Sequence, residues 1–474
     1  MWAIGGCPTH GSLSWQNGSP ILTLFRNVLE GNSLIQKIED SDDPVLVATR
    51  LPNRPTITAS VPGFGTITLK DCFCSGWASQ QSIDLKSSTW NLKIHPQSIW
   101  IGSPPSDLDG QIIRIEVSDT RLAGLFGTSD LKTFRSDFGD EKAAFESLDH
   151  PKNIWAIYGN SQAAIPLGDT GFGLRISTSA GEDWSATRGI TLRSGTTLNL
   201  ATDEPRTITD AFDIVYELEK MISIFCLEPF EFEAIVFAND VNSTVKVWHL
   251  GSGTDTFKPP MRHQLLINFA KHEVISSLCE NWFKQTKTVE LSRWLFTQAL
   301  RESKGGAAQF LAVSQAFEVL GREFGPTKKM DKIQLSDAVE TIKLTLGEKN
   351  FEPEFIDRIG QLIKSSNRSS YRDILEHMLH DVYGQVQNYF GQQLSEFTKD
   401  VSDTRNVVVH MSSDDEARLH AAFGKVNKLN LKLCAVYAIL QAYQLSLPVE
   451  NIGRFMFNNR NARHGLPNDL LEVR

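Results

Sequence analysis

The sequence predicts an α+β protein of two domains, a β-rich N-terminal domain of the sandwich or barrel kind followed by an all-helical bundle. Short runs of β-branched and aromatic residues fill roughly the first 200 residues, between clusters of Gly, Pro, Asn, Asp and Ser. After residue 260, apolar side chains recur at helical spacing instead. The net charge changes at the same place, from −11 over residues 1–260 to +2 over residues 261–474. We therefore expect domains at 1–260 and 261–474.

The N-terminal domain is expected to consist of many short strands with little helix between them, as in sandwiches and barrels. Alternation of apolar and polar residues is clearest over 66–69 and 113–117. A helix is expected over 207–227, and Pro259-Pro260 lies in the predicted linker. Examples of the expected strands before this helix are 21–25, 44–51, 56–61, 65–69, 90–94, 111–117, 154–158, 172–176 and 189–192, and two more strands, 231–238 and 244–250, follow it.

The C-terminal domain is expected to be a bundle whose helices end at glycine and proline. Gly384 and Gly391 interrupt a long helical stretch over 371–397. The segment 403–410 is expected between that stretch and a last long helix over 414–447. The other predicted helices cover 289–303, 307–324, 335–346 and 354–364.

Composition argues against several classes of protein. No apolar run approaches the roughly 20 residues needed to span a bilayer, and the N-terminus lacks a basic stretch followed by an apolar core. Six scattered cysteines are too few for a disulfide framework in a chain of this size. We therefore expect a cytoplasmic protein that does not enter a membrane. The acidic excess of the first domain is unsuited to nucleic acid, so any RNA would be handled by the second.

Nucleotide-binding and metal-binding motifs are scarce. The sequence has no GxxxxGK[ST] loop, no GxGxxG loop, no HExxH and no CxxC. Cys7 and His10, together with Cys72 and Cys74, would supply four zinc ligands if the fold joined them, but their spacing matches no known zinc module. Buried or idle thiols are the favoured interpretation. We expect no metal and no cofactor.

The segment 405–410, RNVVVH, carries side chains suited to phosphodiester chemistry. Arg405 stays charged at any workable pH, and an imidazole such as that of His410 exchanges protons near neutral pH. On a helix, five residues turn through about 500°, which leaves these two side chains about 140° apart. Asn406 and His410, four residues apart, share a face. This set would grip a phosphodiester and move a proton; an exposed Arg and a packed or solvated His are the simpler alternative.

Other polar side chains of the helical domain are weaker candidates. Glu318 lies beside an apolar stripe and would either pair with Arg405 or remain exposed at its edge. His377 and His380 share a helical face, and His420 stands alone. Each of these histidines would contact RNA or simply occupy the surface.

The helical domain resembles a HEPN domain of the ApeA-like branch. The HEPN signature is R-x-x-x-x-H near the start of a late helix, with a polar residue often next to the Arg; Arg405, Asn406 and His410 match it. The N-terminal half is similar to the ApeA N-terminal domain, so the resemblance covers nearly the whole chain. The other segments that carry it are 65–69, 209–238, 308–320 and Tyr371-Arg372.

This resemblance implies a metal-independent endoribonuclease that protects bacteria against phage, often by abortive infection. Arg405 would hold the scissile phosphate and stabilise its growing charge. His410 would remove the 2′-hydroxyl proton or protonate the leaving 5′-oxygen, and Asn406 would orient His410 or the phosphate. The supporting candidates are Glu318, Arg372 and Asp403.

HEPN domains typically dimerise, so the resemblance also implies a homodimer through the helical domain, with one composite site built from two motifs. RNA would be the substrate, with transfer RNA one candidate; DNA is excluded because it lacks the 2′-hydroxyl. A phage-derived trigger and a sensing or regulatory role for the β-rich domain are expected. The alternative is a non-catalytic HEPN scaffold with a ligand-sensing β domain. A carbohydrate-acting β domain ranks last, because no paired carboxylates stand at convincing spacing.

Overall fold

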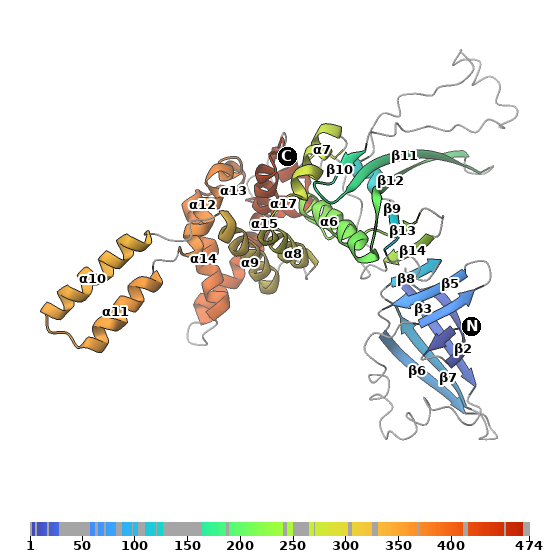
Figure 1. The fold of residues 1–474 in the computed structure, drawn as a ribbon, viewed down its shortest axis with the longest axis horizontal. Coiled ribbons are helices and arrows are strands. Elements are labelled where there is room, and N and C mark those ends of the chain that lie inside the picture. The colour runs from blue at the N-terminus through green and yellow to red at the C-terminus, as the bar shows by residue number, and fades with distance from the viewer. Residues whose placement is uncertain are drawn as a thin grey trace, which may run out of the picture. The chain divides into compact units, whose positions relative to one another are not determined.

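The structure, a computed structural model, is α+β and two-domain, as the sequence predicts (Figure 1). It divides into two compact units, one of Met1–Glu219 with Glu231–Pro259 and one of Lys220–Phe230 with Pro260–Arg474. The described residues are 2–4, 7–16, 19–27, 57–61, 65–70, 73–81, 88–96, 98–102, 110–119, 121–126, 164–185, 189–239, 244–249, 265–269, 271–301, 306–324, 330–366, 369–410, 416–449 and 452–467.

The first unit is built on an antiparallel sheet. Its described strands join in the order β10-β11-β12-β9-β13-β14-β8-β5-β4-β1-β2-β3-β7-β6. The strands are β1 (Trp2–Ile4), β2 (Cys7–Gln16), β3 (Ser19–Asn27), β4 (Ile57–Val61), β5 (Gly65–Lys70), β6 (Phe73–Gln81), β7 (Ser88–His95), β8 (Ser98–Gly102), β9 (Ile112–Ser118), β10 (Ile165–Pro166), β11 (Phe172–Ser185), β12 (Gly189–Arg206), β13 (Ala234–Ala238) and β14 (Thr244–His249).

Strand β9 shows why the predicted alternation is a reliable signal. Ile115 and Val117 are fully buried, whereas Arg114 and Glu116 between them are exposed. The strand pairs with β12 on one side and β13 on the other, so its backbone groups are satisfied on both edges. Its period-two pattern therefore places every second side chain in the core.

Several expected elements differ from those observed. Strands expected over 44–51 and 154–158 lie outside the described residues. Strands β1, β2, β6, β8 and β10 are not among the examples singled out from the sequence, and the short helix α4 (Leu122–Phe126) was not predicted. Strand β2 contains Pro8, Gly11, Ser12 and Ser14, residues that weaken a strand pattern, and it is held in the sheet by its pairing with β3.

Helix α6 (Ile208–Cys226) follows β12 and matches the helix expected over 207–227. Its start is set by a reciprocal cap. The hydroxyl of Thr207 accepts from the backbone N–H of Asp210, and the Asp210 carboxylate accepts from the backbone N–H of Thr207. Residues from Lys220 onward in this helix belong to the second unit.

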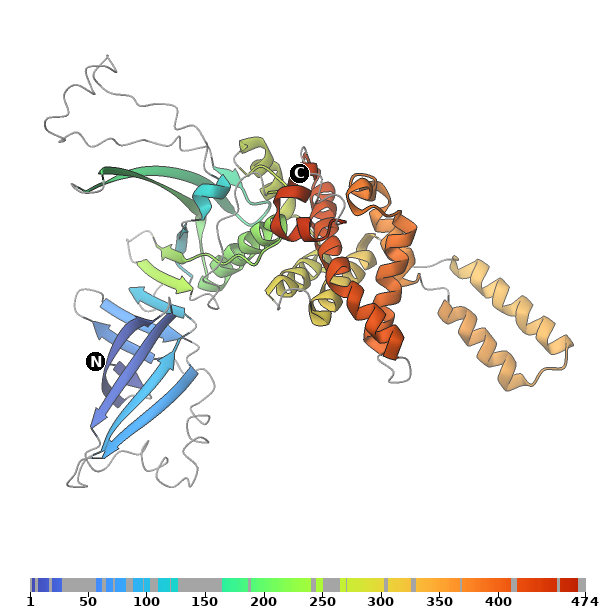
Figure 2. The ribbon, with the colours of Figure 1, turned by 180° about the vertical axis from the view of Figure 1, so that it is seen from behind.

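The second unit is a helical bundle (Figures 1 and 2). Helix α7 was not predicted, although its buried side chains from Val274 to Trp282 follow helical spacing. The helices are α7 (His272–Trp282), α8 (Lys287–Arg301), α9 (Ala307–Phe324), α10 (Lys332–Glu348), α11 (Pro353–Ser366), α12 (Tyr371–Tyr383), α13 (Gln387–Phe390), α14 (Leu394–His410), α15 (Glu416–Gln444), α16 (Ile452–Asn458) and α17 (Arg460–His464).

Aromatic stacking holds α8, α9 and α15 together. The rings of Phe296 and Tyr437 stack with centroids 4.0 Å apart, and Phe317 meets Tyr437 edge-on at 5.3 Å. The buried Tyr437 hydroxyl lies 2.8 Å from the hydroxyl of Ser292, which also donates to the carbonyl of Ala316. These contacts make α9 a fixed element of the core.

The long stretch expected over 371–397 is broken at both glycines. Gly384 caps the end of α12, and Gly391 ends α13 with a positive φ of 62°, a left-handed conformation that suits glycine. A new helix, α14, then begins at Leu394 and continues through His410. The expectation that 403–410 lies between helices, near the start of a late one, is therefore wrong: it forms the last two turns of α14. The cause is the early restart of the helix after Gly391.

Candidate functional site

Arg405 faces α9 from the next-to-last turn of α14. Its guanidinium Nη2 donates to Oε2 of Glu318 at 2.5 Å, so the expected pairing of these two side chains is present. The guanidinium carbon also lies 4.6 Å from the ring centroid of Tyr371, a cation–π distance. Arg405 is one-quarter exposed. An ion pair and a cation–π contact therefore hold the partly exposed guanidinium of Arg405 in place.

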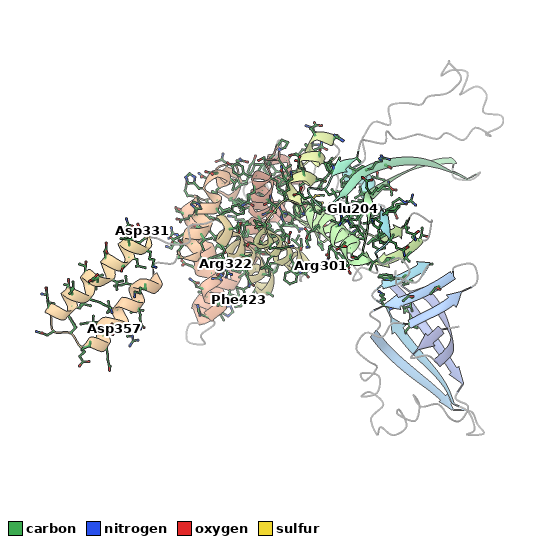
Figure 3. The ribbon with its side chains drawn as sticks, viewed as in Figure 1. Glu204, Arg301, Arg322, Asp331, Asp357 and Phe423 are labelled. Atoms are coloured by element: carbon green, nitrogen blue, oxygen red, sulfur yellow. The ribbon has the colours of Figure 1, made fainter. Side chains whose placement is uncertain are left out.

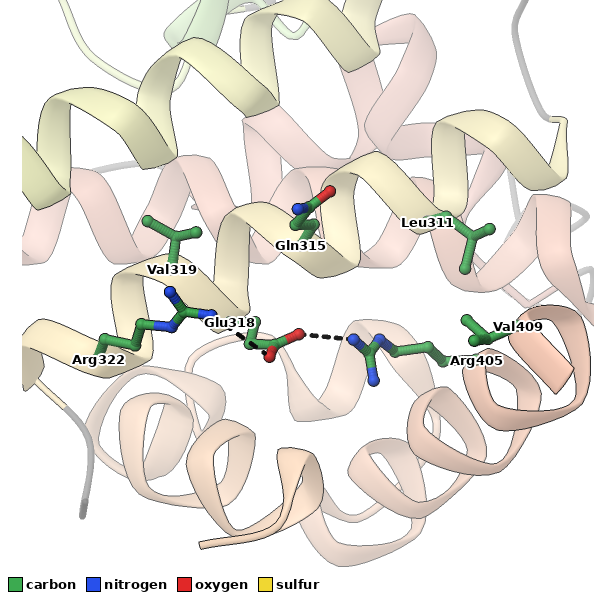
Figure 4. A pocket seen from close by; sticks show the side chains of 7 residues that line it. All are labelled: Leu311, Gln315, Glu318, Val319, Arg322, Arg405 and Val409. Atoms are coloured by element: carbon green, nitrogen blue, oxygen red, sulfur yellow. Dashed lines mark hydrogen bonds and ion pairs between the residues drawn. The ribbon is translucent and has the colours of Figure 1, made fainter. Parts of the chain in front are cut away.

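Glu318 joins two arginines. Besides Arg405, it lies 3.9 Å from Nη2 of Arg322, one turn further along α9 (Figure 4). The carboxylate is about one-third exposed, so water screens both pairs and each contributes little to stability. Two positive charges face one negative charge, which leaves the group with a net positive charge.

Tyr371 supports Arg405 from the first turn of α12. A capping box formed by Ser370 and Asp373 fixes the start of that helix and thus the position of the ring. Burial raises the pKa of the Tyr371 hydroxyl above its ordinary value, although neighbouring Ser314 and the charge of Arg405 oppose the rise. The residue is therefore a neutral phenol that offers its ring face to the cation.

A close approach of α9 and α12 makes this contact reachable. A Cβ added to Gly321 would lie 2.1 Å from Cγ2 of Ile374, so any larger residue would push the two helices apart. Glycine at this position lets α12 bring Tyr371 next to the Glu318–Arg405 pair.

A cavity of about 310 Å³ opens beside the pair (Figure 4). Its α9 residues fall at positions i, i+4, i+7, i+8 and i+11, which share one face of the helix, and its α14 residues are one turn apart. The lining combines apolar side chains with an amide, a carboxylate and two guanidinium groups. The lining residues are Leu311, Gln315, Glu318, Val319, Arg322, Arg405 and Val409.

His410, Asn406 and Asp403 lie on a different side of α14. All three are exposed, and with Lys399 they form a polar stripe at i, i+4, i+7 and i+11. Because the segment is helical throughout, Arg405 and His410 point about 140° apart. The structure thus joins Arg405 to Glu318 and leaves Asn406 and His410 on the outer face of the same helix.

Arg372 takes part in a different set of hydrogen bonds, away from Arg405. Its Nε donates to Glu376 at 2.9 Å and its Nη2 to the carbonyl of Ser395 at 3.4 Å, in the first turn of α14. The backbone of Ser395 is ten residues from Arg405, about 15 Å along the helix axis. The structure therefore does not join Arg372 to the Arg405 pair; it ties α12 to the start of α14.

The remaining histidines and cysteines form no cluster in the described part. His377, His380 and His420 are exposed, and His380 contacts the neighbouring Asp381 at 2.9 Å. No group of three or more metal-ligating side chains occurs among the described residues. The side chains of Cys7, His10, Cys72 and Cys74 lie outside the description.

Three other cysteines are buried free thiols, and burial raises the pKa of Cys279 and of Cys434 to about 12. Cys279 and Cys434 are therefore uncharged side chains of the core. Within the described residues, no helix is long and apolar enough to cross a membrane.

Sequence reasoning missed Tyr371, Arg322 and Gln315 as members of this site. The helical spacing of Gln315 and Arg322 around Glu318 was available as a signal, since residues three and four apart share a face. The contribution of Tyr371 had no local signal, because it depends on how α12 packs against α9 and α14.

Comparison with known families covers both units. The family described as Apea-like HEPN matches residues 311–448, which include Glu318, Arg405 and His410. The family described as ApeA N-terminal domain 1 matches residues 8–282, more than half of the chain. No curated protein and no solved structure matches the chain. With the R-x-x-x-x-H segment on α14 and a strand-rich region before the bundle, the chain belongs to the ApeA-like proteins that carry a C-terminal HEPN domain.

Proposed function

We propose that the chain is a metal-independent endoribonuclease of phage defence whose active site is built from two copies of the segment 405–410. Membership of the ApeA-like HEPN proteins supports a role in defence against phage. The observation that carries the enzymatic proposal is Arg405, a cation held by Glu318 and Tyr371 at the edge of an open cavity. A guanidinium restrained in this way is suited to binding a phosphate.

Arg405 would hold the scissile phosphate and stabilise the charge that develops on its oxygens. Its ion pair with Glu318 keeps the guanidinium in one orientation while leaving part of it open. Binding of a phosphate would compete with the Glu318 carboxylate for this cation. Arg322, on the other side of Glu318, would then take over part of the carboxylate's pairing.

His410 would transfer the protons. One imidazole would accept the proton of the 2′-hydroxyl as its oxygen attacks phosphorus, and a second would donate a proton to the 5′-oxygen as the P–O5′ bond breaks. The products are a 2′,3′-cyclic phosphate and a free 5′-hydroxyl. The chemistry needs the 2′-hydroxyl, which makes RNA the substrate; transfer RNA remains one candidate.

Two chains are needed because one chain supplies one His410, on a different side of α14 from Arg405. A homodimer that brings two outer faces of α14 together would place two histidines and two Asn406 side chains around one phosphate, and the long Arg405 side chain would reach round α14 to contact it. Asn406 shares a face with His410 and would orient it, while Asp403, one turn before Asn406 and two turns before His410, would support Asn406 from the same face. The β-rich unit would sense a phage-derived trigger.

The test is RNA cleavage by the purified chain. His410→Ala and Arg405→Ala should each lower the rate by about 10²-fold or more, since proton transfer and charge stabilisation each contribute on that scale. His380→Ala, an exposed histidine on α12, is the matched control and should leave the rate unchanged. Activity that vanishes in EDTA, or that persists on a 2′-deoxy substrate, would contradict the proposal.

A second candidate is a non-catalytic HEPN scaffold whose β-rich unit reads a ligand. The ion pair between Arg405 and Glu318 favours the scaffold, because a binding module does not need a free arginine to hold a phosphate. Phage protection measured in cells separates the two. Protection that survives His410→Ala would support the scaffold, and protection lost with His410→Ala in a folded dimer would support the nuclease.

A further inference from the structure

The cavity beside Arg405 has a charged end and an apolar end. Glu318 and Arg322 on α9 and Arg405 on α14 line the charged end, where two guanidinium groups face one carboxylate (Figure 4). Leu311 on α9 and Val409 on α14 line the other end (Figure 4). Leu311 precedes Glu318 by seven residues, about 10 Å along the helix axis. The cavity is therefore long enough to hold an anionic group and an apolar ring at separate ends.

An amide lies between the two ends. Gln315 lines the cavity one turn after Leu311 and one turn before Glu318, and it is exposed. Its amide has no hydrogen-bond partner among the described residues. A side-chain amide carries a carbonyl acceptor and two N–H donors, so it pairs with a group that presents a donor next to an acceptor. The edges of nucleobases have this arrangement.

The surface of α14 leads from this cavity to His410. At 100° per residue, Val409 is about 40° round the helix from Arg405. Asn406 follows at about 100° and His410 at about 140°, in the same direction. Val409, Asn406 and His410 are all exposed. One open strip of α14 therefore joins the apolar end of the cavity to the proposed proton-transfer residue.

Helix α9 turns its open side in the same direction. Gln315 is about 60° round α9 from Glu318 in the same rotational sense. Glu318 pairs with Arg405 while the earlier Leu311 lies with the later Val409, so the two helices run antiparallel here. In an antiparallel pair, equal rotations away from the shared contact lead to the same side. An RNA strand over His410 therefore has a continuous surface into the cavity.

The size, charge and exposure of the cavity fit one nucleotide. Its volume of about 310 Å³ is at the lower end of the range of small-molecule sites, roughly 300–1,000 Å³. The side chain of Arg322 is 70% exposed (Figure 3), and Val409 is 52% exposed. A net positive charge at one end suits a phosphate, and the aliphatic end suits the face of a base. A fatty acid would use both ends but would leave the Gln315 amide unpaired.

From these observations we propose that the cavity holds the base of the nucleotide next to the scissile phosphate, and that Gln315 determines which base is accepted. The proposal rests on the ribonuclease activity proposed above. The face of the base packs against Leu311 and Val409, and its polar edge pairs with the Gln315 amide. Arg322 contacts the phosphate on the far side of that nucleotide. Cleavage then follows one base at one position beside the cut.

The first test is cleavage of an RNA pool of randomised sequence by the full-length chain, read by sequencing the new 5′ ends. The wild type should enrich one base by about tenfold at a single position beside the cut, as hydrogen-bonded readout of a base edge does. Gln315→Leu keeps the size of the side chain and removes its polar groups. It should reduce the enrichment to about twofold or less, because the base edge then has no partner.

The matched control is Gln361→Leu, the same substitution at an exposed glutamine of α11, which should keep the base preference of the wild type. Circular dichroism checks that both variants keep their helices. A wild type that cuts RNA with no base preference beside the cut overturns the proposal. A folded Gln315→Leu variant that keeps the preference overturns it too.

A second test does not need cleavage. The dissociation constants of the four ribonucleoside 5′-monophosphates are measured with the full-length chain by isothermal titration calorimetry. One of the four should bind about tenfold more tightly than the others, and Gln315→Leu should make the four alike. Arg322→Gln should weaken all four by a similar factor, because it removes a phosphate contact that every nucleotide shares.

The two tests separate this proposal from the ribonuclease itself. Discrimination among the nucleotides that depends on Gln315, in a chain that cuts no RNA, would keep the base site and remove the ribonuclease. RNA cleavage by a chain that binds the four nucleotides equally, or binds none of them, would keep the ribonuclease and overturn the base site.

Discussion

Two consecutive helix pairs of the second unit, α8–α9 and α10–α11, have similar lengths but bury very different surfaces. Helix α9 buries nine of its 18 residues, whereas α10 buries Val339 alone among its 17. Apolar residues surround α9 because α8, α12, α14 and α15 all contact it. Among the described elements, α10 packs closely against α11 alone. A candidate active-site residue, Glu318, is thus fixed by the bundle core, and the hairpin that α10 and α11 form can change without disturbing it.

The largest expected effect on stability comes from a cavity created in the core beside α9. Phe317→Ala should lower the free energy of unfolding by about 3–5 kcal/mol, since the buried ring leaves a cavity next to Tyr437. Phe351→Ala at the hairpin is the comparison: its ring is 48% exposed, and the loss should be well under half as large. Denaturant titration followed by helical circular dichroism measures both. Equal losses would mean that the hairpin is as tightly packed as the core.

The next effect depends on pH. Burial lowers the pKa of Lys432 to about 8, helped by Lys428 and opposed by Asp400. The folded pKa lies below the unfolded one, so the unfolded chain binds more protons between about pH 8 and 10.5, and the free energy of unfolding rises with pH through that window. The rise is on the order of 3 kcal/mol.

Lys432→Met should remove this rise in the free energy of unfolding with pH. The substitution also removes the hydrogen bonds that Lys432 donates to the carbonyl of Phe390 and to the side chain of Gln392, which changes stability at neutral pH but not its slope with pH. Unfolding titrations at pH 7.5, 9 and 10 compare it with the wild type. Lys349→Met, exposed beside the hairpin, should keep the rise of the wild type. A wild type whose stability falls over this window relative to Lys432→Met would show the sign to be wrong.

A smaller effect is expected on activity. Tyr371→Leu removes the ring beneath the Arg405 guanidinium, a contact of about 1–2 kcal/mol when partly buried, so RNA cleavage should fall by about five- to thirtyfold. Tyr371→Phe keeps the ring and should retain most of the rate. The pair separates support of Arg405 from proton transfer by the phenol. Equal loss in both variants would assign the hydroxyl a direct part.

The smallest effect is expected at the hairpin. Asp331→Ala removes the side-chain acceptor that caps α10 and should cost about 1 kcal/mol. Hydrogen exchange should become faster in α10 and α11 and remain unchanged in α9. Faster exchange in both pairs of helices would show that they unfold as one cooperative unit.

Local patterns predicted much of the bundle. Helix α9 begins and ends where the sequence places it, since Gly306 precedes its first turn and Gly325-Pro326 follows its last. The pairing of Glu318 with Arg405 was one of two alternatives that the sequence left open for this carboxylate, and it forms. Strand β9 was predicted from its alternation. Strand β2 was not among the examples singled out, because its residues have weak strand preference and it forms only by pairing with a neighbouring strand.

Composition and residue spacing alone specify the α+β class, the helical character of residues 307–324, 335–346 and 354–364, and the presence of a cation and an imidazole five residues apart. These depend on composition and spacing, which are local properties. Tertiary structure decided that the segment 405–410 closes α14, that Tyr371 lies against Arg405, and that Arg372 does not. It also decided which apolar residues of α10 and α11 remain open. Side chains far apart in the chain meet only when helices pack, and no local period encodes which helix faces which.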